Sequence, residues 1–307
     1  MQRFTSIAAL TALMLTAAAC GDSTPTSSPS STSASTSSTP AVDTTGLPAD
    51  TPKAIISLSP SATEMLFAIG GADQVLAVDD QSNYPAAALS KPHELSGFEP
   101  NVEAIAKLKP DLVLMSDTKV KAQLESLGIK VWVGVAATTF DDVYSQIEQL
   151  GAATGHIGSA AELVAKMQAD IKTVVDGTPK PTKPLTVYHE LDPTFYSATS
   201  NTFIGKVDAL FGLKNIADGA QPGNDYPQLS AEYIVQANPD IIVLADTKCC
   251  TQSAETVGAR PGWSAIAAVK AGDVVAMDDD IASRWGPRIV DYITLIAAAV
   301  SKVPAGA

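Results

Sequence analysis

The chain has 307 residues, of which 46% are hydrophobic, and its formal net charge is −13. Its length and apolar content suffice for one large domain or two smaller ones, and they exclude a chain that is disordered throughout or embedded in a membrane. The acidic excess, without any stripe of basic residues, argues against nucleic-acid binding.

Residues 1–20 are typical of a targeting segment. Arg3 gives a positive start, and residues 7–19 are apolar or small but too few to span a bilayer. The sequence AAAC at 17–20 resembles a bacterial lipobox, in which the cysteine is lipidated and becomes the mature N-terminus, although Ala17 stands where leucine is usual. The alternative is ordinary cleavage near Ala19. We expect a lipid on Cys20 that anchors the protein to the outer face of the cell membrane.

Residues 21–52 are predicted to form a disordered tether. Between residues 23 and 40 every residue except Ala34 is Ser, Thr or Pro. Such a segment cannot bury enough apolar surface to fold. Ordered structure is therefore expected from about Lys53.

Residues 53–150 are predicted to form a first α/β lobe. Short apolar runs that suit buried strands stand at 54–58, 75–78, 112–115 and 131–135. Between and after them lie stretches typical of helices, at 64–69, 101–109, 120–127 and 139–150. Strands that alternate with helices in this way predict a parallel sheet.

One stretch of the chain occurs twice. NVEAIAKLKPDLVLMSDTK at 101–119 aligns without a gap with SAEYIVQANPDIIVLADTK at 230–248, so that Glu103 matches Glu232. Each copy has a capping residue, an acid in the first helical turn, a proline that stops the helix, and an apolar run that suits a buried strand. The repeat predicts two similar parallel-sheet lobes.

The rest of the chain fits this plan. In residues 151–182, Ser159 is predicted to cap a long helix, to about residue 176, that connects the lobes. The second lobe, residues 183–307, is expected to have strands at 185–188, 241–245 and 274–277, helices at 202–210 and 289–300, and Trp263 in a short helix. The loop after its first strand is predicted to begin at His189.

Enzyme signatures such as G-x-S-x-G, H-E-x-x-H or a Walker loop do not occur in the sequence. The three histidines lie far apart, and two adjacent cysteines are poorly spaced for a metal site, so no metal site is predicted. Cys249 and Cys250 fit either a vicinal disulfide or two free thiols.

Loops at the carboxyl ends of the strands are the expected place for a ligand. They carry a group of aromatic and basic side chains: Tyr84, Tyr196, Arg284, Trp285 and Arg288, with Phe98 and Trp263 expected close by. Each aromatic residue taken singly fits core packing better than ligand binding. As a group they favour a cleft between the lobes that holds a large, flat, partly apolar ligand.

Several motifs resemble the substrate-binding proteins of ABC importers that carry vitamin B12, ferric siderophores and haem. They are SLSPSATEML at 57–66, SNYP at 82–85, GFEPNVEAI at 97–105, KPDLVL at 109–114, and Trp263. The branch that binds vitamin B12 is the most similar, chiefly through SNYP and the loop before Glu103. The resemblance implies two α/β lobes joined by one rigid helix, with the ligand in the cleft between them and no enzymatic activity.

The resemblance also implies roles for single residues. Glu103 and Glu232 would be the docking acids, one on each lobe, that meet arginines on the two permease subunits. Tyr84 matches a cobalamin contact by motif, whereas Tyr196 and Trp285 suit that role only by position. The implied ligand is cobalamin or another corrinoid, and no cofactor is expected.

Other functions stay open at this point. A ferric siderophore would meet Arg284 and Arg288, because its chelate is anionic. Haem would need an axial ligand, which His189 or a tyrosine could supply. More distant alternatives are a chelatase-like metal enzyme and a surface adhesin or sensor with no importer.

Overall fold

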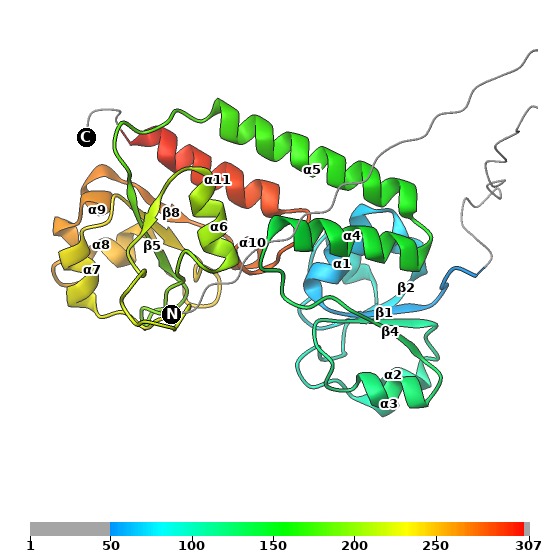
Figure 1. The fold of residues 1–307 in the computed structure, drawn as a ribbon. Coiled ribbons are helices and arrows are strands. Elements are labelled where there is room, and N and C mark those ends of the chain that lie inside the picture. Colours follow the sequence, from blue (N-terminus) through cyan, green and yellow to red (C-terminus); the bar gives the residue numbers. More distant parts are fainter. Residues whose placement is uncertain (1–49, 304–307) are drawn as a thin grey trace, which may run out of the picture. The chain divides into compact units, whose positions relative to one another are not determined.

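The structure is a computed structural model that describes residues 50–303. The predicted signal peptide, Cys20 and nearly all of the predicted tether lie outside the described residues. Within residues 50–303, no helix is long and apolar enough to cross a membrane. The described chain contains two four-stranded parallel sheets (Figure 1).

The first sheet has the strand order β2-β1-β3-β4. Its strands are β1 (Ile55–Leu58), β2 (Val75–Val78), β3 (Leu112–Met115) and β4 (Lys130–Val133). Every residue of β1 and β3 is buried, as their continuous apolar sequences predicted. These two strands are central and pair in register, with Ile55 opposite Leu112.

Three short helices connect the strands of the first lobe, and a longer one follows the last strand. They are α1 (Pro60–Ala68), α2 (Val102–Lys107), α3 (Lys121–Ser126) and α4 (Phe140–Thr154), with 3-10 turns at Gly71–Gln74 and Ala86–Ser90. Helix α1 begins earlier than predicted. The Ser59 side chain accepts a hydrogen bond from the Ala62 N–H, and Pro60 takes the first helical position, where its missing N–H costs nothing.

The second sheet repeats the topology of the first, with the order β6-β5-β7-β8. Its strands are β5 (Thr186–Glu190), β6 (Lys214–Asn215), β7 (Ile241–Leu244) and β8 (Val274–Ala276). The two copies of the repeated stretch form equivalent elements, namely α2 with β3 and α7 (Ala231–Ala237) with β7. Two similar parallel-sheet lobes are therefore confirmed.

Five further helices and one 3-10 turn belong to the chain after the connecting helix. They are α6 (Phe203–Leu210), α8 (Ala254–Gly258), the turn Trp263–Ala265, α9 (Ala267–Ala271), α10 (Asp279–Ser283) and α11 (Ile289–Lys302). The sequence did not reveal α8, α9, α10 or β6, because elements of two to five residues are too short to show a period.

The connecting helix α5 (Ile157–Gly177) begins two residues before the predicted cap, Ser159. Gly155 ends α4 with a φ of 81°, and the chain turns at once into α5. A side chain at Gly151 would bring its Cβ within 2.4 Å of the Ala160 Cβ. Glycine at this position therefore allows α4 and α5 to pack closely, and α5 starts as soon as the turn is complete.

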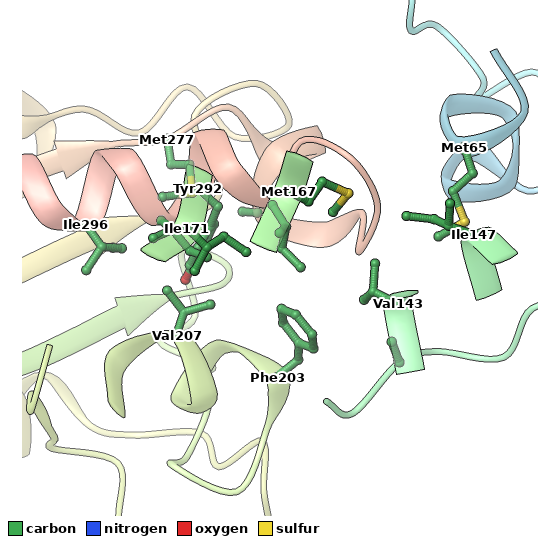
Figure 2. Close-up of a cluster of buried hydrophobic side chains, with 14 of the residues drawn as sticks. Met65, Val143, Ile147, Met167, Ile171, Phe203, Val207, Met277, Tyr292 and Ile296 are labelled. Carbon is green, nitrogen blue, oxygen red and sulfur yellow. The ribbon is translucent and has the colours of Figure 1, made fainter. Parts of the chain in front are cut away.

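One apolar cluster holds the connecting helix in place. Helix α11 lies alongside α5 (Figure 1). Figure 2 shows Met167 and Ile171 of α5 among buried side chains of other helices, including Val143 of α4 and Tyr292 of α11. The same cluster contains Ile55 of the first sheet and residues of the second. Because the helix is packed along its length, bending it would open a continuous core.

Candidate ligand-binding site

A pocket of about 520 Å³ lies at the carboxyl ends of strands of the first sheet. Ser59, Ser116 and Gly134, which follow β1, β3 and β4 directly, line one side of it. The chain from α10 to the start of α11 contributes Asp280, Ser283, Arg284 and Trp285. The other lining residues are Pro60, Ser61, Gln81, Phe98, Val135, Ala136, Ala137 and Gln146.

The polar lining is almost entirely uncharged. It consists of hydroxyl and amide groups together with one acid and one base, Asp280 and Arg284. Arg284 Nη2 donates a hydrogen bond of 2.6 Å to Asp280 Oδ1. Burial acts to raise the pKa of Asp280, but hydrogen bonds from Lys248 and Asn83 lower this pKa below its usual value. The carboxylate is therefore ionised at neutral pH. The charges of the lining therefore cancel.

Three of the predicted ligand contacts meet around this pocket: Phe98, Arg284 and Trp285. Phe98 is 72% exposed, which is unusual for a phenylalanine. Trp285 is partly buried and stacks on Phe203, with 4.6 Å between the ring centroids. The pocket thus combines a free aromatic ring with one that is held in place.

Tyr84 and Arg288 lie next to each other but do not line the pocket. The Tyr84 ring is 45% exposed, and the Arg288 guanidinium lies over it, 4.3 Å from its centroid. Arg288 itself is buried and donates to both carboxylate oxygens of Glu64. Arg288 is therefore not free to bind an anionic ligand, contrary to its predicted role.

Arg284 is committed to protein groups in a similar way. In addition to Asp280, it donates to Asn83 Oδ1 at 2.7 Å, to the Gln81 carbonyl at 2.9 Å and to Glu64 Oε1 at 3.2 Å. A guanidinium has five N–H donors, and these contacts occupy most of them. Arg284 borders the pocket, but its charge is compensated within the protein.

Trp263 was predicted to lie close to the cleft, and this prediction is wrong. It is 1% exposed and belongs to the core of the second lobe. Its ring stacks on Phe195 with 5.7 Å between centroids, and the Arg260 guanidinium lies 4.6 Å from its centroid. An apolar ring of this size gains more from burial in the lobe than from exposure on a loop.

Tyr196 lies on the loop that follows β5 and is 41% exposed. It forms an isolated bridge with Gln228, and it does not line the pocket described above. Its predicted contact with a ligand stays a prediction.

The expectation that His189 opens a loop is wrong. His189 lies inside β5 and is 1% exposed. Its Nε2 lies 3.0 Å from both carboxylate oxygens of Asp208, which is also buried. A histidine in this position serves as an internal hydrogen-bonding partner, and its Nε2 is not available as an axial ligand for haem.

Cys249 and Cys250 are joined by a disulfide. The chain around them is fastened to α10: the N–H groups of Lys248 and Cys249 donate to Asp279 at 2.9 and 2.8 Å. Because α10 also carries Asp280 and Ser283, this loop supports one wall of the pocket.

Glu103 and Glu232 occupy equivalent positions on the two lobes. Each lies in the first turn of its helix, α2 or α7, two residues after a side-chain cap, Asn101 or Ser230. Both are exposed, and within the described chain neither forms an ion pair. Their predicted docking role stays a prediction.

Several lining residues were not among the predicted ligand contacts. Ser116 follows a predicted strand, and the rule that ligands bind at the carboxyl ends of parallel strands would have found it. Residues 134 and 135 were expected inside a strand, but β4 ends earlier, at Val133. Gln146 gave no such signal, because it reaches the pocket from helix α4, whereas Ser283 directly precedes Arg284, which was expected near a ligand. Among the described residues, no group of three or more His, Cys, Asp or Glu could hold a metal ion.

Comparison with known proteins agrees with this architecture. Residues 55–281 match the family model described as periplasmic binding protein. An uncharacterized ABC transporter substrate-binding lipoprotein, YvrC of Bacillus subtilis, is 34% identical over 81% of this chain and 80% of its own length. A cobalamin-binding protein of Halobacterium salinarum is also 34% identical, over 85% of this chain and 73% of its own.

A solved structure supports the same assignment. The periplasmic vitamin B12 binding protein BtuF of Vibrio cholerae is 25% identical, with a TM-score of 0.67 over 81% of this chain and 96% of that one. The family match covers both sheets, and the relatives cover most of the chain. This chain therefore belongs to the periplasmic binding protein family, as an extracytoplasmic solute-binding protein of an ABC importer.

Proposed function

We propose that this protein captures a corrinoid, cobalamin or a close analogue, and delivers it to an ABC importer. The observation that carries the proposal is the electrically balanced lining of the pocket, in which Arg284 and Asp280 are paired with each other. A corrinoid carries little net charge and is surrounded by amide side chains. Hydroxyl and amide groups such as those of Ser59, Ser116 and Gln146 suit such a ligand.

The size of the ligand brings further residues into the site. A corrinoid is larger than a 520 Å³ pocket. We infer that its ring also extends over two exposed aromatic side chains, Phe98 in the lining and Tyr84 outside it. A flat macrocycle gains most from such rings because they bury a large area with little loss of side-chain freedom.

The names of similar proteins also favour a corrinoid ligand. A relative that is 34% identical is a cobalamin-binding protein, and vitamin B12-binding proteins of Yersinia are 28% identical over 84% of this chain. Haem or a ferric siderophore fits the site less well. Both carry anionic groups, whereas Arg284 and Arg288 are occupied by protein acids and the Nε2 of His189 is bonded to Asp208.

Anchoring and docking complete the proposal. A lipid on Cys20, followed by the Ser/Thr-rich segment, would hold the binding domain close to the membrane that contains the permease. Glu103 and Glu232 would then place one negative charge on each half of a twofold permease. Charges at the rim of an interface fix encounter and register more than affinity.

The test is a calorimetric titration of the purified protein with cyanocobalamin, haemin and a ferric hydroxamate, followed in parallel by tryptophan fluorescence. Tight, saturable binding of cyanocobalamin alone is the expected result. Binding of haemin or of the ferric chelate in its place would reject the corrinoid and retain the importer. If none of the three bound, the choice of ligand class would have to be abandoned.

A further inference from the structure

A buried ion cluster joins the first lobe to the chain between α10 and α11. Its centre is Glu64 of α1, which is only 2% exposed. Arg288 Nε donates to Glu64 Oε2 at 2.8 Å, a second Arg288 nitrogen donates to Oε1, and Arg284 Nη1 lies 3.2 Å from Oε1. We refer to Glu64, Arg284 and Arg288 as the latch.

The latch reaches directly into the loop that carries Tyr84. Arg284 donates to the Gln81 carbonyl at 2.9 Å and to Asn83 Oδ1 at 2.7 Å. Asn83 Nδ2 in turn donates to Asp280 Oδ2 at 3.0 Å. Arg288 then places its guanidinium over the Tyr84 ring.

These contacts share one geometric feature. The loop residues Gln81, Asn83 and Tyr84 make all of these contacts with residues 280–288, about two hundred residues further along the chain. The arginines themselves are held by Glu64, which lines no part of the pocket. Glu64 therefore holds the two arginines that contact this loop.

We propose that Glu64 and Arg288 are positioning residues: the latch orders the loop 80–85 and so presents the Tyr84 ring to the bound ligand. The inference rests on the proposed function only where it takes Tyr84 as a ligand contact. It gives Arg288 a role other than binding an anion. It also explains why an acid occupies the interior of α1, where its burial requires a paired cation.

Arginine is the residue type that this arrangement needs. Its planar guanidinium can bond two carboxylate oxygens with one edge while its face lies on an aromatic ring. A lysine would retain the charge and lose both the paired hydrogen bonds and the flat contact with Tyr84. Arg288→Lys therefore separates positioning from simple charge balance.

The first experiment uses the protein without ligand and measures amide hydrogen exchange in the loop. The N–H groups of Asp80, Ser82 and Asn83 are hydrogen-bonded, so their exchange reports how well the loop is ordered. Glu64→Gln and Arg288→Lys are expected to speed this exchange by about tenfold, because the first removes the negative charge of the pair and the second removes its paired hydrogen bonds. Unchanged exchange in both variants would overturn the proposal.

Arg260→Lys is the matched control. Arg260 makes two hydrogen bonds of 2.6 Å to the buried Glu190 in the second lobe and no contact with the loop 80–85. This change also breaks a paired arginine–carboxylate interaction, but it is expected to leave exchange in the loop unaltered. Equal acceleration by the control would show a general loss of stability and would count against the latch.

The second experiment is a double-mutant cycle on cyanocobalamin affinity. Arg288→Lys is expected to weaken binding about tenfold when Tyr84 is present and less than about twofold in a Tyr84→Ala background. Equal effects in both backgrounds would mean that Arg288 does not act through Tyr84. If the wild-type protein fails to bind cyanocobalamin, the proposed ligand is wrong, and the exchange experiment alone decides whether the latch orders the loop.

A fold-preserving variant covers the case in which single changes prevent folding. Replacing both members of the pair, Glu64→Met with Arg288→Met, leaves no buried unpaired charge, and such replacements often preserve stability. This double variant should fold and still show about tenfold faster exchange in the loop. A folded double variant with normal protection there would refute the positioning role.

Discussion

Asp246 lies next to Glu190 inside the second lobe, where both side chains are fully buried. Arg260 donates two hydrogen bonds to Glu190, while neither carboxylate oxygen of Asp246 has a hydrogen-bond partner in the described structure. Burial, together with the charge of Glu190, raises the pKa of Asp246 to about 7, although Arg260 opposes the shift. A proton on Asp246 would supply the donor that Glu190 can accept.

This pair predicts a pH-dependent stability. The folded-state pKa lies above the unfolded value of 3.8, so the stabilisation is complete below pH 4 and is lost as the pH rises through about 7. Between these limits the free energy of unfolding of the wild type should fall, relative to Asp246→Asn, by about 1.4 kcal/mol per pH unit. Urea unfolding at pH 5 and pH 8 measures the difference. A pH-independent difference would contradict the assignment.

Asp117, the equivalent residue of the first repeat, is the matched control. It is partly exposed, and a hydrogen bond from the Lys119 N–H is the main cause that lowers its pKa. A carboxylate whose pKa is lowered in the folded state stabilises the fold at pH values above its unfolded pKa. This stabilisation is lost on acidification. Asp117→Asn should therefore weaken the fold slightly at pH 8 and lose its effect in acid, which is the opposite trend.

Charge reversal at the two exposed acids tests docking. Glu103→Arg combined with Glu232→Arg should reduce importer-dependent uptake by about tenfold or more, because each change places like charges opposite each other. Ligand affinity in solution should not change, since neither residue lines the pocket. Glu162→Arg, which makes the same charge change on the exposed surface of α5, is the control. Normal uptake by the double variant would exclude these acids as docking residues.

The packed connecting helix predicts a small closure on ligand binding. Met167 and Ile171 of α5 belong to an apolar cluster that would have to break for a large rotation of the lobes. Small-angle scattering with and without ligand should show a change of ~1 Å or less in the radius of gyration. A marked compaction would indicate a hinge and would argue against a rigid connection.

Trp285 and Trp263 should respond differently to substitution. Trp285→Ala removes an aromatic wall of the pocket and should lower cyanocobalamin affinity about tenfold. Trp263→Phe leaves a gap in the second lobe and should lower the free energy of unfolding by about 1–3 kcal/mol, with affinity nearly unchanged. Calorimetry and urea unfolding of both variants separate the two effects. A loss of affinity in Trp263→Phe alone would reverse the assignment.

The sequence was sufficient for the architecture because the signals that carry it are local. The buried runs in β1, β3 and β7, and the proline-terminated helices before β3 and β7, each lie within one short stretch. The repeat that contains Glu103 and Glu232 then indicated that these stretches form two similar lobes. His189 was misplaced because the end of a strand depends on its neighbours: β5 extends as far as β7 offers partners, from Ile241 to Leu244.

The site was only partly accessible to the sequence. Trp285 was expected near a ligand because it lies on a loop after a strand, and Phe98 was expected close to such loops; the pocket includes both. The partners of Arg284 and Arg288 could not be anticipated, because Glu64 precedes them by more than two hundred residues and looks like any acid on a short helix. Local periodicity and turn chemistry therefore determined the two lobes, whereas only tertiary packing decided which charges cancel, because electrostatic pairing depends on distance in space and not along the chain.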